Sequence, residues 1–215
     1  DTQGLFNAAL DSGDFPHVTA RRLRNIVAEC FAPRYLTPKP SPAIWLQTLN
    51  HRVSARALNQ LCFVYTARAN LILRDFVTQL YWERYASGYT EISTEDSTEF
   101  VHRATYDGKT KKMWSETTIK RLSSYLLSAC VDYQMLQPFN RSARQITPIR
   151  IDPCTTIILA YDLHLKGIAD NNLINHPDWH LFGLQPEDVR DELKRLGVSR
   201  FWIIQTAADV VSISW

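Results

Sequence analysis

The sequence has few glycines and cysteines, and it has no long apolar run. Its seven glycines form no glycine-rich loop of the kind that cradles a phosphate group. No stretch approaches the roughly 18–20 apolar residues that a membrane-spanning helix needs. The cysteines include no CxxC pair, so we expect reduced thiols, buried in a cytoplasmic protein, at Cys30, Cys62, Cys130 and Cys154. These absences argue against a nucleotide-binding loop, a cysteine-rich metal site and a membrane partner.

Sequence signatures of catalysis are absent as well. The chain contains no GxSxG motif of a serine hydrolase. His176 and His180 are four residues apart, but no third ligand accompanies them, and Pro177 disfavours a regular helix between them. A catalytic cysteine–histidine pair stays open, because such partners meet in space and not in sequence. We expect a protein without a metal, a cofactor or enzymatic activity.

The charge is distributed unevenly along the chain. The net charge is +2, yet residues 17–84 hold ten Lys and Arg against three acids, and residues 103–150 hold nine against three. Residues 85–102 hold four acids and no Lys or Arg, whereas residues 151–215 hold nine acids against five Lys and Arg. Two basic blocks separated by acidic ones predict a localised surface that binds a polyanion.

Apolar residues recur at three- and four-residue spacing in most of the chain, which predicts a mainly α fold. Four prolines predict a linker at residues 32–42. The helices are expected at residues 4–10, 18–35, 42–49, 54–69, 71–85, 93–104, 115–136, 153–165 and 186–196. The other segments are expected to be short β-hairpins at 139–151 and 201–215, and a loop at 171–184. We divide the chain into an N-terminal helical domain, residues 1–88, and a C-terminal domain with winged-helix elements, residues 89–215.

Residues 114–150 are the most informative segment, and they predict the DNA-contacting half of a winged helix. Ser115 is a candidate N-cap for a long helix, whose apolar face begins at Ile119. The hairpin that follows carries arginines at its tip, and Ile146 returns to the core. An α-helix fits the major groove of B-DNA, and a hairpin tip with arginines can contact the backbone or the minor groove.

Basic and small hydroxyl side chains are the candidate DNA contacts, because hydroxyl groups bond to phosphate oxygens and Lys and Arg neutralise phosphates. On the helix and in the loop before it, the candidates are Ser115, Thr117, Thr118, Lys120, Arg121, Lys109, Lys111 and Lys112. At the hairpin tip and near the N-terminus, they are Arg141, Ser142, Arg144, Arg21, Arg22 and Arg24. Scattered cations favour contacts to the phosphate backbone, so we expect weak sequence specificity.

Two segments carry a resemblance to a known family. The sequences TARRLRNIVAECFAPRYL (19–36) and WSETTIKRLSSYLLSACVDYQML (114–136), together with the helix-plus-hairpin ending, resemble the BrxA family of bacteriophage-exclusion (BREX) defence systems. The resemblance covers roughly residues 4–215. It implies a helical protein with winged-helix elements that binds double-stranded DNA and works beside other BREX proteins. It also implies that part of the helical fold is similar to the antitermination factor NusB.

Two other binding functions fit the same basic surfaces. A protein–protein adaptor subunit of the defence complex would use them to meet acidic surfaces of its partners. An RNA-binding protein, which the NusB likeness suggests, would stack bases on Tyr or Trp side chains. The leading hypothesis is a non-catalytic component that binds double-stranded DNA, with homo-oligomer formation on DNA left open.

Overall fold

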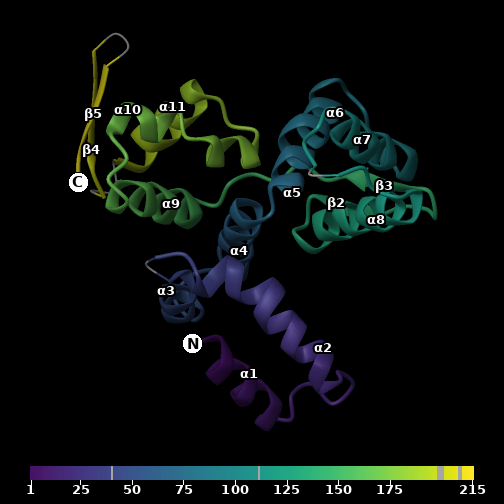
Figure 1. Ribbon diagram of the computed structural model, residues 1–215. Helices are drawn as coiled ribbons and strands as arrows, with labels where there is room; N and C mark the ends of the chain where they lie inside the picture. The colour runs from purple at the N-terminus through teal and green to yellow at the C-terminus, as the bar shows by residue number, and fades with distance from the viewer. Residues whose placement is uncertain (40, 111, 198–200, 208–209) are drawn as a thin grey trace. The chain divides into compact units, whose positions relative to one another are not determined.

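The computed structural model describes residues 1–39, 41–110, 112–197, 201–207 and 210–215 (Figure 1). It is mainly helical with only small antiparallel sheets, which confirms the expected fold class. Contacts divide the chain into two compact units, Asp1–Asn70 and Leu71–Trp215. The boundary that we expected after residue 88 concerns two domains that fold independently, and it stays a prediction. None of the described helices is long and apolar enough to span a bilayer.

The first unit contains only helices. They are α1 (Thr2–Asp11), α2 (Ala20–Asn25), the π-helix η1 (Ile26–Leu36), α3 (Pro42–Leu49) and α4 (Ala55–Ala69). Thr19 caps α2, as its place before the helix suggests, and its hydroxyl accepts the Arg22 N–H at 3.3 Å. Phe6, Leu23 and Val27 are buried together and join α1, α2 and η1.

The linker predicted at residues 32–42 is wrong in its first half, because η1 continues through Pro33 to Leu36. A π-helix bonds each N–H to the carbonyl five residues earlier. This register continues beyond the proline, since the Thr37 N–H donates to the Ala32 carbonyl at 2.8 Å. Tertiary contact supports the same turn, because the Tyr35 hydroxyl donates to the Cys62 carbonyl of α4 at 3.2 Å.

The second unit begins with helices around a three-stranded sheet. The helical elements are α5 (Leu71–Phe76), the π-helix η2 (Val77–Tyr81), α6 (Trp82–Ala86), α7 (Thr94–Tyr106) and α8 (Glu116–Asp132). The strands are β1 (Glu91–Ser93), β2 (Leu136–Pro138) and β3 (Ala143–Ile146), in the antiparallel order β1-β3-β2. Ile92 of β1, fully buried, lies opposite Arg144 of β3. The hairpin that we expected at residues 139–151 runs instead from Leu136 of β2 to Ile146 of β3.

The rest of the second unit is α9 (Pro153–Leu165), α10 (Asp170–Ile174), the 3₁₀ helix η3 (Pro177–Phe182), α11 (Pro186–Gly197), β4 (Ile203–Ala207) and β5 (Val210–Ser214). The two long helices and the terminal hairpin confirm the sequence prediction. The loop predicted at 171–184 is wrong, because α10 and η3 form there and bury Leu173 and Trp179. The indole N–H of Trp82 donates to the Leu181 carbonyl at 3.1 Å and so ties α6 to η3.

The expected burial of all four cysteines is only partly correct. Cys130 is buried and Cys62 is half-buried, whereas Cys30 and Cys154 are exposed. The four thiols are free in the structure. Burial raises the pKa of the Cys130 thiol to about 12. Burial, and then the neighbouring Asp152 carboxylate, raises the pKa of Cys154.

These positions predict an order of thiol reactivity in the native protein. The thiolate is the reactive form, so at pH 8 we expect maleimide to label Cys30 first and Cys154 more slowly. Cys130 should react on the order of a thousandfold more slowly than Cys30, until the protein is unfolded. Time-resolved labelling with peptide mass spectrometry measures this order. Rapid native labelling of Cys130 would contradict the packing of α8.

Candidate nucleic-acid interface

Helix α8 has one buried face and one exposed face. Ser115 caps it as predicted, and its hydroxyl accepts the Thr118 N–H at 3.4 Å. Ile119, Leu126 and Cys130 are buried at helical spacing, which turns the face that holds the candidate contacts outward. The sequence-predicted helix and its cap are thus confirmed.

Two small polar residues hold α8 against α7. Ser97 and Ser123 are fully buried. The Ser97 hydroxyl donates to the Ser123 carbonyl at 3.1 Å, and the Ser123 hydroxyl lies 3.3 Å from the Ser97 carbonyl and 2.8 Å from that of Ile119. Small side chains let the backbones of the two helices approach closely, and both of these buried hydroxyls have a hydrogen-bond partner. The orientation of the exposed face of α8 therefore rests on this contact.

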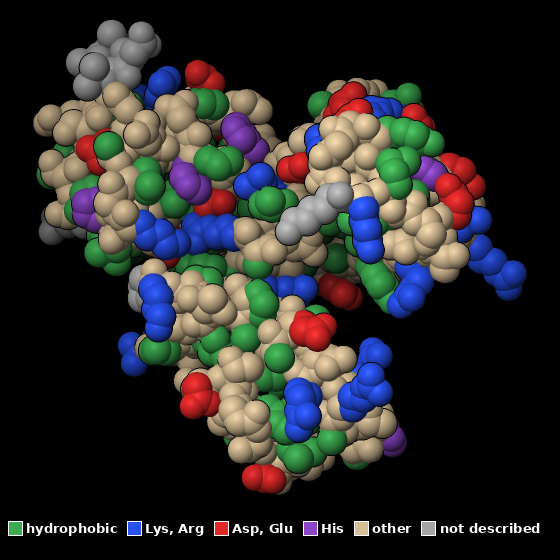
Figure 2. All heavy atoms as spheres, viewed as in Figure 1, with side chains coloured by type: hydrophobic (Ala, Val, Ile, Leu, Met, Phe, Trp, Pro, Cys, Tyr) green, Lys and Arg blue, Asp and Glu red, His purple; other side chains and the backbone are tan. Residues whose placement is uncertain are grey.

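The exposed face of α8 combines hydroxyl groups with cations. Thr117, Thr118, Lys120 and Arg121 are all exposed. A hydrogen bond with Tyr125 raises the pKa of Arg121. Figure 2 shows Lys and Arg side chains standing out from the surface over α8 and the β2–β3 hairpin. This face can donate hydrogen bonds to phosphate oxygens and neutralise their charge.

The loop before α8 supplies further candidate cations. Lys112 is exposed. Lys109 is also exposed, and its Nζ lies 3.4 Å from the Gln79 Oε1, the acceptor of a hydrogen bond. Lys111, another predicted contact, lies outside the described residues.

A single asparagine organises the tip of the β2–β3 hairpin. The Asn140 Oδ1 accepts the N–H groups of Ser142 at 2.8 Å and Ala143 at 2.7 Å. Arg141 and Ser142 are exposed at the tip, as predicted. Arg144 is not at the tip, because it lies half-buried in β3, and its Nη1 donates to the carbonyls of Asn140 and Ala143 at 2.9 Å. Its role in the structure is to hold the tip.

The hairpin tip and the first turn of α8 contact α7 at two separate points. The Ser142 carbonyl accepts the Thr94 N–H at 2.7 Å, at the start of α7. Further along α7, the His102 Nε2 lies 3.3 Å from the Glu116 carboxylate of α8. Thr94 and His102 are eight residues apart on α7, so these points are about 12 Å apart. The predicted contacts therefore form two clusters along one element and not a single centre.

The three predicted arginines near the N-terminus belong to the first unit. Arg21, Arg22 and Arg24 lie on α2, and all three are exposed. The Arg24 guanidinium stacks over the Phe6 ring, 4.9 Å from its centroid. This contact directs one of the three cations along the surface of its own unit.

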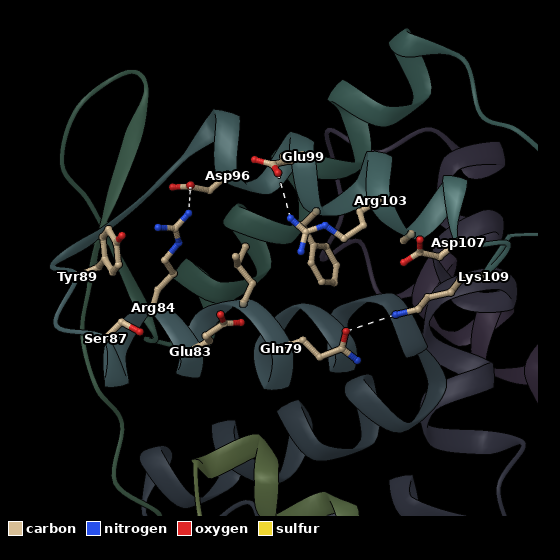
Figure 3. Close-up of a pocket in the computed structure, with 13 residues that line it drawn as sticks. Gln79, Glu83, Arg84, Ser87, Tyr89, Asp96, Glu99, Arg103, Asp107 and Lys109 are labelled. Carbon is tan, nitrogen blue, oxygen red and sulfur yellow. Dashed lines mark hydrogen bonds and ion pairs between the residues drawn. The ribbon is translucent and has the colours of Figure 1, made fainter.

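A polar groove of about 440 Å³ lies between η2–α6 and α7 (Figure 3). Acids and bases alternate along it and largely pair with one another. Arg103 pairs with Glu99 at 3.0 Å, one turn apart on α7, and Lys109 reaches across to Gln79. Because acids and bases are mixed along it, the groove is a weaker candidate for binding a polyanion than the face of α8.

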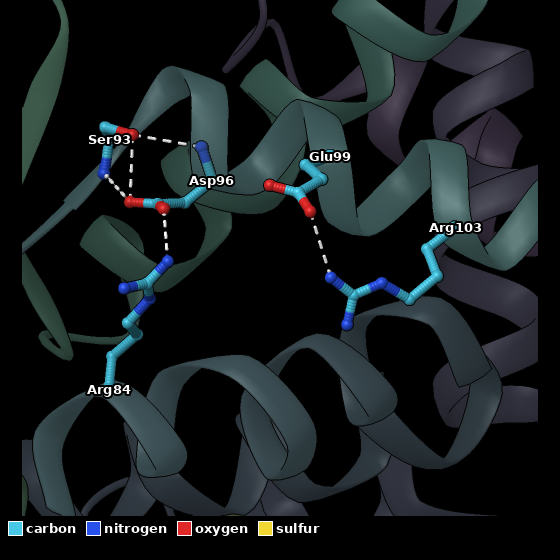
Figure 4. A network of polar contacts seen from close by, with 5 residues as sticks. All are labelled: Arg84, Ser93, Asp96, Glu99 and Arg103. Atoms are coloured by element: carbon cyan, nitrogen blue, oxygen red, sulfur yellow. Dashed lines mark hydrogen bonds and ion pairs between the residues drawn. The ribbon is translucent and has the colours of Figure 1, made fainter. Parts of the chain in front are cut away.

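A network at one end of the groove anchors α7 (Figure 4). The Asp96 carboxylate accepts the Ser93 N–H at 2.9 Å and the Ser93 hydroxyl at 2.8 Å, which completes a capping box. The same carboxylate pairs with Arg84 of α6. The sequence indicated a helix start at Ser93, but it did not indicate the pair of Asp96 with Arg84, because Arg84 is twelve residues away and follows no local pattern.

These surfaces offer positive charge and hydrogen-bond donors. Within the described residues, no group of three or more His, Cys, Asp or Glu side chains is placed to hold a metal ion. The exposed cations and hydroxyls of α8 and the hairpin tip form the clearest surface for a large anion. They are held by a buried helix contact and an ordered turn, which limits the entropy lost on binding.

Comparison with known proteins identifies a matching family. The sequence model of a family described as BrxA matches residues 5–161, which is more than half of the chain. Neither the curated proteins nor the solved structures include a significant match. The matched residues contain α8, the β2–β3 hairpin and the polar groove, and they end within α9.

Proposed function

The chain belongs to the BrxA family, a component of BREX phage-defence systems, and on this premise we propose that it binds double-stranded DNA without catalysing a reaction. The contacts are mainly to the phosphate backbone. The surface is the exposed face of α8, with the β2–β3 hairpin tip as a second point of contact. The protein acts beside other proteins of its defence system.

The order of elements in the second unit supports this proposal. The chain runs from the helical segment α5–η2–α6 through β1, α7 and α8 to β2 and β3. In the sheet, β3 lies between β1 and β2. This succession is typical of a winged helix, a variant of the helix-turn-helix in which the second helix of the pair enters the major groove. In that arrangement α8 is the recognition helix and the β2–β3 hairpin is the wing.

The observation that carries the proposal is the composition of α8. Residues 117–131 contain no Asp or Glu, while Lys120 and Arg121 are exposed beside the hydroxyls of the first turn. The N-terminus of a helix carries a partial positive charge and suits an anion. The nearby Glu116 carboxylate lies beside His102 at 3.3 Å. A phosphate that approaches this face meets donors and cations.

Fluorescence anisotropy of a labelled duplex across a salt series tests the proposal. We expect binding that is micromolar or tighter at low salt and weakens steeply as salt rises. Lys120→Ala/Arg121→Ala should weaken binding about tenfold and reduce the salt slope by about 2, because two phosphate contacts are lost. Arg141→Ala should reduce the slope by about 1.

The matched control is Lys194→Ala/Arg195→Ala, which removes the same charge from α11 in the same unit. It should leave the affinity nearly unchanged. Equal losses in both double variants would mean that net charge, and not the face of α8, sets the affinity. Absence of binding at low salt would favour the adaptor function, and stronger competition by single-stranded RNA would favour RNA binding.

A further inference from the structure

The β2–β3 hairpin exposes a bulky apolar side chain where β2 ends. Phe139 directly follows β2 and is 62% exposed. In β2 itself, Leu136 is buried and lies opposite the buried Ile146 of β3 (Figure 1). Phenylalanine is among the residue types that are most often buried. Phe139 lies beyond the last residue pair of the two strands, so its ring does not belong to the core of the hairpin and is open to a partner.

The turn that carries Phe139 is fixed on both sides of this residue. Before it, the ring of Pro138 restricts the backbone. After it, the Asn140 Oδ1 accepts both the N–H and the hydroxyl of Ser142, at 2.8 and 3.0 Å. The Thr94 hydroxyl of α7 donates to the Ser142 carbonyl at 3.1 Å, in addition to the bond from its N–H. A side chain on a turn that is held in this way loses little backbone entropy when it binds.

The sequence around Phe139 is basic. Residues 133–151 contain three arginines and no Asp or Glu. Arg141, two residues after Phe139, is exposed at the hairpin tip. Duplex DNA offers both chemistries that this pair needs, because its phosphates attract the guanidinium and the faces of its bases stack on an aromatic ring. Charge complementarity and the exposed ring together favour a base step of DNA as the partner of Phe139.

We propose that Phe139 is an apolar wedge, which enters the minor groove and unstacks one base step when the protein binds duplex DNA. This inference rests on the proposed function, because it requires the hairpin to contact DNA. Arg141 binds a phosphate beside the groove, and the Phe139 ring separates two neighbouring base pairs. Apolar side chains inserted in this way kink the duplex by about 20–90° toward the major groove. The protein therefore bends the DNA that it binds.

A wedge gives the protein a preference for DNA that deforms easily. Pyrimidine–purine steps such as TA are flexible, and a mismatched base is the least costly to unstack. We expect the native protein to bind a duplex with one central mismatch about tenfold more tightly than the fully paired duplex of the same length. Contacts to the phosphate backbone alone give no such preference, because both duplexes carry the same charge.

Energy transfer between dyes at the two ends of a short duplex, measured at saturating protein, tests the proposal. The native protein should increase the transfer, because a bend brings the two ends together. Phe139→Ala should lose most of this increase and reduce the mismatch preference to less than about twofold. It should leave the salt slope unchanged, since no charge is removed. Phe139→Leu should retain the bend, because leucine also serves as a wedge. Leu165→Ala is the matched control, since it truncates an apolar side chain that is 80% exposed at the end of α9 in the same unit.

The outcomes separate the wedge from DNA binding itself. Salt-dependent binding by the native protein without an increase in energy transfer would overturn the wedge and leave the proposed function in place. A bend that Phe139→Ala leaves unchanged, or that Leu165→Ala removes equally, would overturn the wedge as well. Absence of binding at low salt would overturn both proposals. Circular dichroism of each variant shows whether it is folded, so a lost bend is not mistaken for a lost structure.

Discussion

Replacing Trp179 with alanine is expected to lower the free energy of unfolding by about 3–5 kcal/mol. Trp179 is 1% exposed, and its indole N–H donates to the Leu173 carbonyl at 2.7 Å, so it joins η3 to α10. Alanine leaves a cavity in the interior and removes one hydrogen bond to the Leu173 carbonyl, which still accepts the His176 N–H at 3.2 Å. Since domains are stable by about 5–15 kcal/mol, this loss is a large part of the total.

Two further variants separate burial from hydrogen bonding. Trp179→Phe keeps most of the apolar contact and removes the N–H, so it should cost about 1–2 kcal/mol. Phe139→Ala, at a side chain that is 62% exposed, should change stability by less than about 0.5 kcal/mol. Urea unfolding followed by far-ultraviolet circular dichroism measures all three. A Trp179→Ala variant as stable as Phe139→Ala would contradict the packing of η3.

Trp179 also explains why the sequence prediction was wrong at residues 171–184. Asparagines, a proline and two histidines are typical of a loop, and they hide the apolar residues between them. Helices of five and six residues are too short for helical spacing to be recognised. Burial of Leu173 and Trp179 against other elements stabilises these helices, and such contacts between distant residues are absent from local sequence.

Long helices with caps were predictable, because their signals lie in the local sequence. Helix α8 shows its cap at Ser115 and several turns of apolar spacing, and α9 and α11 begin with prolines at their first turns. In these segments the caps, the apolar spacing and the tertiary packing all favour the same helix, so the sequence alone indicates it. The π-helix η1 was only partly predictable, because the sequence indicated both a helix at residues 18–35 and a linker from residue 32, and the helix continues through Pro33 where it contacts α4.

The candidate site was predictable in composition and less so in geometry. The sequence places cations and hydroxyls near α8, and the structure exposes most of them. The sequence could not indicate that Arg144 donates hydrogen bonds to the backbone of its own hairpin, since that contact depends on the turn around Asn140. It also could not pair Arg84 with Asp96, which come from separate helices. Contacts between elements decide which cations stay exposed at the surface.

Replacing Gly183 with alanine is expected to cost about 2–4 kcal/mol, and the same change at Gly108 only about 1 kcal/mol. Both glycines have φ of +70°, a backbone conformation that disfavours any Cβ. At Gly108, no described atom lies within 4 Å of the added Cβ, so only the backbone penalty applies. At Gly183 the added Cβ would lie 2.9 Å from the Trp82 ring, which must move. That movement strains the hydrogen bond from Trp82 to the Leu181 carbonyl.

A double-mutant cycle with Trp82→Ala isolates the overlap from the backbone penalty. In that background, Gly183→Ala should cost about 1 kcal/mol, as at Gly108, so the coupling between positions 82 and 183 should be about 1–3 kcal/mol. Thermal unfolding and urea unfolding of the four proteins give the coupling. Equal costs of Gly183→Ala in both backgrounds would show that the Trp82 ring does not lie over Gly183. A coupling of the expected size would show that α6 and η3 are held in direct contact by the Trp82 ring.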